Sequence, residues 1–273
     1  MKARKLSRRQ FLVASAASVA VVAGGAVGVT KLTQPTSGDT PATYYASHQK
    51  DIMAGFDETM TFMRPFLAAK VGDAAADAVA KETRVEYAAL IPQLPYIGGD
   101  ANELTGNLSQ SAGALAFYRV LKARGRPVEE VGEILYKGYD AQMANTPAWV
   151  LSVWGILQSV GLDAGQAEKD AATSQQRTYP ADWVTTYVKG DGQSFDWGVD
   201  YTECGICKFF HAHGADELTP YLCQLDYPAS QAYNMGLERT ETLAQGGRRC
   251  DFRYKRGRPT PSGWPPPWLK GGA

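Results

Sequence analysis

The sequence has none of the short motifs that mark the common nucleotide-binding and serine-hydrolase sites. It contains no P-loop, no Rossmann glycine fingerprint and no G-x-S-x-G elbow, and no segment is repeated. Cysteine and histidine are scarce, with four and three copies among 273 residues. All four cysteines lie in the last quarter of the chain. A chain of this length can bury a sizeable core, so it does not need disulfides to stabilise that core.

Net charge is also absent, because 28 Lys and Arg residues balance 28 Asp and Glu residues. Residues 1–43 hold six of the basic residues and one of the acidic residues, which leaves 22 positive and 27 negative charges in the rest. A body with about five net negative charges disfavours nucleic-acid binding, so we expect no nucleic-acid partner.

The N-terminus has the pattern of an export signal. Arg8 and Arg9 precede Phe11, and an apolar stretch rich in Ala, Val and Gly runs from Val13 to Val29. This pattern predicts a twin-arginine signal peptide over residues 1–29 and a linker over 30–43. We therefore expect the translocation machinery as a partner and a periplasmic location, with the segment either cleaved or kept as a membrane anchor.

The body predicts an α+β fold in one domain, residues 44–255. Apolar residues recur at three- and four-residue spacing through 44–178, which indicates a helical half. From 179 to 255 the residue pattern predicts an antiparallel sheet with helices on one face, with the elements in the order ββααββ. The Pro-rich segment 256–273 predicts a polyproline-like tail that either docks or stays disordered. We expect hairpins from 182–188 with 194–201 and from 237–243 with 250–254, and helices over 204–213 and 219–235.

Potentially reactive or metal-binding side chains are most concentrated at Cys204, Cys207 and His211. On a helix these positions are i, i+3 and i+7, so two thiols and an imidazole would project from one face. They predict an open catalytic zinc site, or a closed structural one if Cys223 or Cys250 supplies a fourth ligand. Two alternatives remain open: one cysteine is a thiolate nucleophile with a histidine as its base, or the cysteines are disulfides or buried thiols.

Charged residues near these cysteines are further candidates. Asp226 or Glu203 would activate water or orient a histidine. Arg239 and Arg248 flank the last turn and would hold an anionic substrate. Tyr221, two residues before Cys223, is a further substrate-binding candidate.

Three segments resemble the L-2-amino-thiazoline-4-carboxylic acid hydrolase family: Phe195–Cys207, Leu218–Asp226 and Arg239–Arg253, with a thinner likeness over Arg119–Pro127. The resemblance implies a hydrolase that opens a cyclic isothiourea to N-carbamoyl-L-cysteine. The closing segment Ala244–Phe252 is also similar to vinyl-reductase-type small-molecule-binding domains, some of which carry cysteine-bound zinc. That likeness implies a ligand pocket.

A second class of function fits the same residues. An exported module could bind a small molecule and zinc without catalysis, as an accessory subunit of a redox enzyme with a periplasmic partner protein. A closed four-ligand metal site would favour this alternative, because no coordination position would remain for water.

Overall fold

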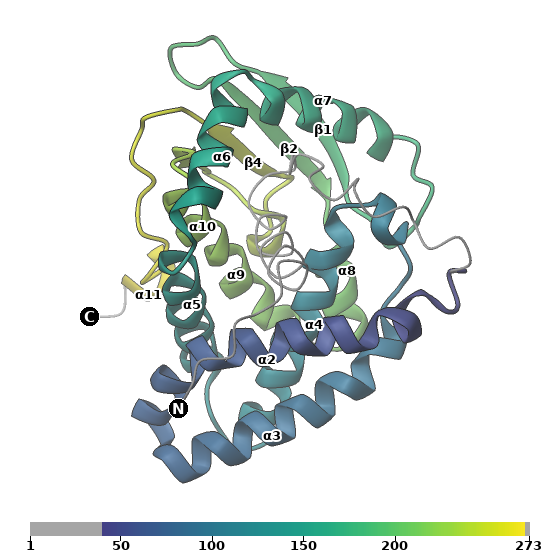
Figure 1. Cartoon of the computed structure of the whole chain (residues 1–273), viewed down its shortest axis with the longest axis vertical. Helices are drawn as coiled ribbons and strands as arrows, with labels where there is room; N and C mark the ends of the chain where they lie inside the picture. Colours follow the sequence, from purple (N-terminus) through teal and green to yellow (C-terminus); the bar gives the residue numbers. More distant parts are fainter. Residues whose placement is uncertain (1–39, 271–273) are drawn as a thin grey trace.

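The computed structural model describes residues 40–270, and the predicted signal peptide and most of the predicted linker lie outside them. The N-terminal part is helical and the C-terminal part holds a small antiparallel sheet, which confirms the α+β class (Figure 1). No helix within the described residues combines the length and apolar composition that crossing a membrane requires. The helical part comprises α2 (Tyr44–Val71), α3 (Asp73–Leu90), α4 (Leu104–Lys122), α5 (Val128–Ala144), α6 (Ala148–Ser159) and α7 (Leu162–Ser174), with 3-10 turns η2 (Ile91–Gln93) and η3 (Gly99–Ala101) before α4.

The helix α4 is the centre of the helical part. Thirteen of its 19 residues are buried, and Leu115 and Phe117 are among the most buried side chains. The helices α2 and α3 form an antiparallel pair that packs on α4 and α5. Gly72 makes the tight connection between α2 and α3 because its φ of 83° lies in a region that favours glycine.

The sheet has four antiparallel strands in the order β1-β2-β4-β3. The register places Tyr201 opposite Cys250 and Val199 opposite Phe252. Both predicted hairpins are therefore confirmed. The strands are β1 (Val184–Lys189), β2 (Trp197–Glu203), β3 (Leu237–Glu238) and β4 (Cys250–Tyr254).

The strand β3 is shorter than the predicted 237–243, and Asp251 explains the difference. Its Oδ1 accepts the backbone N–H groups of Thr240 and Glu241, at 2.9 and 2.7 Å. These N–H groups are satisfied by a side chain instead of a neighbouring strand, so the ladder ends at Glu238.

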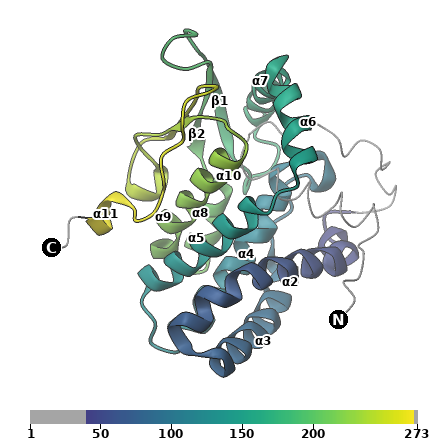
Figure 2. The same ribbon diagram turned by 60° about the vertical axis from the view of Figure 1, so that its left-hand side comes forward.

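Helices connect the two hairpins and pack between the sheet and the helical part (Figures 1 and 2). The sheet lies at one end of the molecule and the α2–α3 pair at the other. The predicted ββααββ order is present, although the second helix is interrupted. The connecting segments are α8 (Gly205–Ala212), η4 (Asp216–Leu218), α9 (Thr219–Leu222), η5 (Cys223–Leu225) and α10 (Asp226–Ala232).

The Pro-rich tail docks on the body as far as residue 270. The backbone N–H of Gly263 donates to the Tyr136 hydroxyl at 3.1 Å, and the Trp264 ring lies 5.8 Å from the Tyr136 ring. A Cβ on Gly263 would lie 2.6 Å from the Tyr227 ring, so the tail approaches the body closely. The described part of the tail ends in the short helix α11 (Pro267–Lys270).

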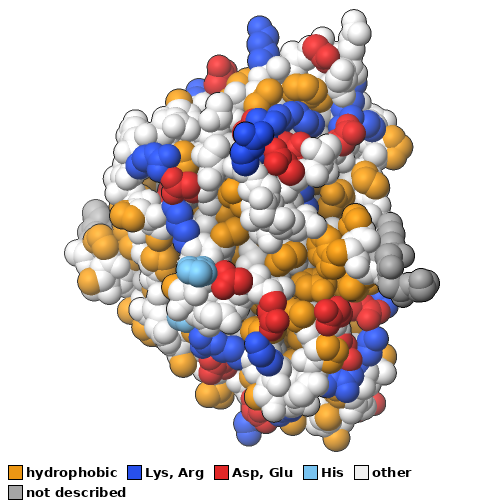
Figure 3. Space-filling model, turned by 180° about the vertical axis from the view of Figure 1, so that it is seen from behind, with side chains coloured by type: hydrophobic (Ala, Val, Ile, Leu, Met, Phe, Trp, Pro, Cys, Tyr) orange, Lys and Arg blue, Asp and Glu red, His pale blue; other side chains and the backbone are white. Residues whose placement is uncertain are grey.

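Charged side chains of both signs are interspersed around hydrophobic ones on the face seen in Figure 3. Elsewhere in the fold and on this surface, ion pairs are exposed where both partners reach solvent, as in the pair of Lys122 with Glu217 at 2.8 Å. Pairs of this kind contribute little to stability individually, because water and salt screen them.

Candidate active site

A buried ion pair joins the start of α10 to the loop after β3. Arg239 Nη1 donates to Asp226 Oδ2 at 2.6 Å, and Nη2 donates to the backbone carbonyl of Cys223 at 2.8 Å. The Arg239 side chain is 2% exposed, against 23% for Asp226. Its guanidinium also lies 5.3 Å from the Tyr227 ring and 5.0 Å from the Phe252 ring. These contacts fix the guanidinium and thereby the carboxylate.

The environment of Asp226 suits proton transfer. Burial raises its pKa to about 6, although the positive charge and hydrogen bond of Arg239 act in the opposite direction. A carboxyl group with this pKa is ionised at pH 7 and still exchanges protons readily near neutrality. Asp226 can therefore accept a proton from water and return it in a later step.

Three cysteines lie around this pair. Cys250 is buried on β4, and its Sγ accepts the Leu243 backbone N–H at 3.2 Å. Cys223 belongs to η5, directly before Asp226, and Cys204 precedes α8. The three thiols are close enough to raise one another's pKa values. The sequence analysis named all three positions as candidates, and its closed-zinc alternative brought Cys223 or Cys250 to Cys204.

These cysteines are thiols rather than thiolates at neutral pH. Burial raises the pKa of Cys250 to about 12, and it raises the pKa of Cys223 well above its ordinary value. For Cys204 the main cause is a hydrogen bond with Cys207, and burial adds to it. Since the thiolate is the nucleophile, this environment does not activate these three cysteines.

The predicted zinc ligands do not converge. The helix α8 begins at Gly205, so Cys204 is its N-cap, and the Cys207 backbone N–H donates to Cys204 Sγ at 3.5 Å. The His211 side chain is 81% exposed and its Nδ1 lies 3.0 Å from Asp216 Oδ1. Across residues 40–270, no three His, Cys, Asp or Glu side chains are grouped so as to hold a metal ion. Zinc therefore stays a prediction from the sequence.

The other predicted site residues lie apart from the Asp226–Arg239 pair. Glu203 forms ion pairs with Arg177 and, at 2.5 Å, with Lys208. Arg248 is exposed in the turn before β4. Tyr221 is buried between α5 and the tail, where its ring lies 6.2 Å from that of Trp264.

His213 contacts Arg119 on α4. Its Nδ1 is 3.1 Å from Arg119 Nη2, and burial together with the Arg119 charge lowers its pKa. It is therefore neutral at pH 7, and it is held on the α4 side of α8.

Two tyrosines near Asp226 were not predicted. Burial raises the pKa values of Tyr201 and Tyr139, and the negative charge of Asp226 contributes to both shifts. Alternation along β2 could have indicated Tyr201, because it follows Val199 on the same face as Trp197. Tyr139 is on α5, 87 positions before Asp226, and no local pattern links the two.

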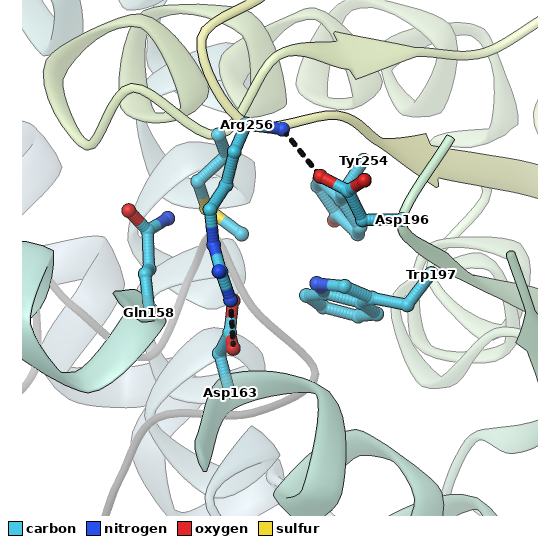
Figure 4. A pocket seen from close by; sticks show the side chains of 7 residues that line it. Gln158, Asp163, Asp196, Trp197, Tyr254 and Arg256 are labelled. Carbon is cyan, nitrogen blue, oxygen red and sulfur yellow. Dashed lines mark hydrogen bonds and ion pairs between the residues drawn. The ribbon is translucent and has the colours of Figure 1, made fainter. Parts of the chain in front are cut away.

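A separate, narrow crevice that leaves no room for a water molecule lies between α7 and the sheet (Figure 4). Arg256 reaches across it toward Asp163, with 3.6 Å between Nη2 and Oδ1, and Trp197 lies beside them. The Arg256 backbone N–H also donates to Asp196 at 2.8 Å. These contacts tie the segment after β4 to α7 and the first hairpin, which is a structural role.

The fold thus places the Asp226–Arg239 ion pair inside an α+β domain. The model of the L-2-amino-thiazoline-4-carboxylic acid hydrolase family matches residues 112–254, just over half of the chain. The protein belongs to this family, and the matched span contains Asp226, Arg239 and all four cysteines. Neither the curated proteins nor the solved structures contain a match.

Proposed function

We propose that the protein is a hydrolase that opens a small cyclic isothiourea or related amidine, with Asp226 as its acid–base residue. The observation that carries the proposal is the buried Asp226 carboxyl group, which has a pKa of about 6 and is held by Arg239 within the family segment. A hydrolase needs a group of this kind, because water is a weak nucleophile until a base removes its proton.

The reaction begins with water at the ring carbon that lies between nitrogen and sulfur. Ionised Asp226 takes a proton from this water as its oxygen bonds to the carbon. The carbon–nitrogen double bond becomes a single bond in this addition, and the proton left on the added oxygen passes to the ring nitrogen. The carbon–sulfur bond then breaks, the carbon becomes a urea carbonyl, and protonated Asp226 gives its proton to the departing sulfur. With 2-amino-thiazoline-4-carboxylic acid as substrate, the product is N-carbamoyl-cysteine.

Arg239 is a positioning residue in this scheme. Its contacts with Asp226 and the Cys223 carbonyl use both terminal nitrogens, and only 2% of its side chain is exposed. It therefore orients the carboxylate and opposes the rise of its pKa, which keeps Asp226 ionised at pH 7. The thiols of Cys204, Cys223 and Cys250 lie around the Asp226–Arg239 pair and are neutral.

Incubation of reduced, purified protein with 2-amino-thiazoline-4-carboxylic acid tests this proposal. Mass spectrometry should detect a product heavier by one water molecule, with a free thiol that reacts with a thiol reagent. Absence of turnover in a metal-supplemented sample contradicts the hydrolase. Binding of the acid without turnover would favour the non-catalytic binding module instead.

Export and zinc are further expectations from the sequence. Replacement of Arg8 and Arg9 by lysine should keep the full-length precursor in the cytoplasm if the twin-arginine prediction is right. Metal analysis of protein purified under reducing conditions tests the expectation of about one zinc per chain. The proposed reaction uses no metal step.

A further inference from the structure

Two buried side chains on neighbouring helices carry hydrogen-bond donors without a partner. They are the hydroxyl of Tyr139 on α5 and the indole Nε1 of Trp154 on α6. The two residues are 7% and 4% exposed. Within the described part of the chain, neither donor forms a hydrogen bond. An unpaired buried donor costs about 1–3 kcal/mol, so two of them in one region need an explanation.

The two donors belong to one cluster, which also includes Tyr233. The rings of Trp154 and Tyr233 are 5.5 Å apart in an edge arrangement. Burial raises the pKa of Tyr139, and electrostatic interactions with Tyr233 and Asp226 add to this shift. Tyr139 therefore lies within electrostatic reach of the proposed acid–base residue Asp226. Trp154 contacts Tyr233, which interacts with Tyr139 as well.

Buried tyrosines elsewhere in the fold are paired. The Tyr87 hydroxyl donates to the Ser109 carbonyl at 2.8 Å, and the Tyr45 hydroxyl donates to the Pro95 carbonyl at 2.9 Å. Tyr87 is 2% exposed, so burial at that position does not prevent pairing. Thr83 on α3 also carries a buried hydroxyl without a partner, but the unpaired donors of Tyr139 and Trp154 are the two that share one hydrophobic cluster.

We infer that Tyr139 and Trp154 bind the carboxylate of the substrate through hydrogen bonds from the phenol and the indole. An indole N–H only donates, so its ligand atom must be an acceptor, and a carboxylate offers two acceptor oxygens to two donors. Arg239 does not supply this contact, because Asp226 and Cys223 occupy its terminal nitrogens. This inference rests on the proposed function for the identity of the acid, and it assigns the binding residues.

The first test needs no ligand. Tyr139→Phe removes a hydroxyl without a partner, so the melting temperature of the ligand-free protein should stay the same or rise. Tyr87→Phe is the matched control, because it removes a paired hydroxyl and should lower the melting temperature by about 3 °C. An equal fall in both variants means that the Tyr139 hydroxyl has a structural partner, and this overturns the inference.

The second test measures binding by calorimetry. The dissociation constant of 2-amino-thiazoline-4-carboxylic acid should rise about 10- to 100-fold in Tyr139→Phe and in Trp154→Phe, the loss expected for a hydrogen bond to a charged group. Tyr87→Phe should bind as the wild type does. Unchanged binding in both site variants overturns the inference, whatever the turnover.

Turnover separates the two proposals. Weaker binding in the variants of a protein that never hydrolyses the acid supports the inference and contradicts the hydrolase. If the wild type binds neither this acid nor any of a panel of small carboxylates, a carboxylate is not the ligand, and the inference fails.

Discussion

Arg239 and Asp226 are 13 residues apart in the sequence and form a 2.6 Å ion pair whose guanidinium is almost fully buried. The pair links the first residue of α10 to the loop after β3. Removal of one partner would leave the other charge buried and unpaired, which costs about 3–5 kcal/mol, whereas removal of both costs less. The pair therefore couples the proposed chemistry to the fold, and variants that retain the hydrogen bond are preferable for tests of function.

Asp226→Asn is such a variant, because the amide oxygen can still accept from Arg239. It cannot take a proton from water, so kcat/KM for ring opening should fall by about 10²- to 10⁴-fold. In the wild type, kcat/KM should rise with pH through a midpoint of about 6, where Asp226 ionises. Steady-state kinetics from pH 5 to about 8 measure both effects.

Glu217→Gln is the control for this experiment. Glu217 forms an exposed ion pair with Lys122, so its loss should leave the rate and its pH profile unchanged. If Asp226→Asn keeps the wild-type rate, or if the midpoint near pH 6 persists in it, another group carries the acid–base role.

The same carboxyl group makes stability depend on pH. Its pKa in the folded state, about 6, is above the unfolded value, so the folded state binds more protons between these pH values. The contribution of Asp226 is thus fully present below about pH 4 and is lost as the pH rises through 6, a change of about 3 kcal/mol. Urea unfolding of the wild type and Asp226→Asn at several pH values should reveal this decline as a change in their difference.

Asp191 provides a comparison of opposite sign. Hydrogen bonds from the backbone and side chain of residues 193–195 lower its pKa to about 2. Its contribution is therefore present above about pH 4 and is lost as the pH falls toward 2. The difference between the wild type and Asp191→Ala should shrink on acidification, while the difference for Asp226→Asn changes in the other direction. Equal pH dependence for both variants contradicts the assignment.

Local patterns predicted the elements of this fold well. The hairpin β1–β2 follows from β-rich segments on either side of Gly190 and Gly192, and the helices α2–α7 follow from the apolar spacing through 44–178. Such features depend on residues within a few positions of one another. The length of β3 could not be predicted in this way, because the Asp251 side chain that ends it comes from the opposite strand.

The candidate site was predicted only in part, for a similar reason. The sequence identified Asp226, Arg239 and the cysteines, but the spacing rule assigned His211 to them as well. In the structure Cys204 is the N-cap of α8, and His211 on this helix is exposed beside Asp216. Tyr139 lies near Asp226 only because α5 packs against α10, and a single sequence contains no sign of that contact.

The thiols near Asp226 should react slowly with alkylating reagents. With a pKa of about 12, Cys250 is almost entirely protonated at pH 7.5, and Cys204 and Cys223 are protonated for related reasons. Labelling with iodoacetamide should be slow at these three positions in native protein, whereas in urea all four cysteines should react. Peptide mass spectrometry locates the label.

Substitution of the same cysteines should also spare catalysis. Cys204→Ser, Cys223→Ser and Cys250→Ser should each keep turnover within about tenfold of the wild type, since none of them acts as a nucleophile. Fast labelling of one cysteine, together with loss of turnover in the folded variant of that cysteine, would instead support the thiolate mechanism that the sequence left open.

Gly132 on α5 lies directly against Tyr221. A Cβ at this position would be 2.4 Å from Tyr221 Cδ1, which is too close for any real contact. Tyr221 is 5% exposed, and its ring packs against the tail through Trp264 and Trp268. Gly132→Ala should therefore push Tyr221 outward and lower the free energy of unfolding by about 1–3 kcal/mol.

The matched control is Gly155→Ala on α6, where nothing lies within 4 Å of the added Cβ. Alanine restricts the unfolded chain and suits a helix, so this change should stabilise the protein by up to about 1 kcal/mol. Urea unfolding measures both variants, and limited proteolysis after Arg256 tests whether Gly132→Ala also loosens the tail. Since Tyr221 contacts α5 on one side and the tail on the other, the tail should become easier to cleave only in Gly132→Ala. If Gly132→Ala has the stability and the proteolysis rate of Gly155→Ala, Tyr221 does not hold the tail on α5.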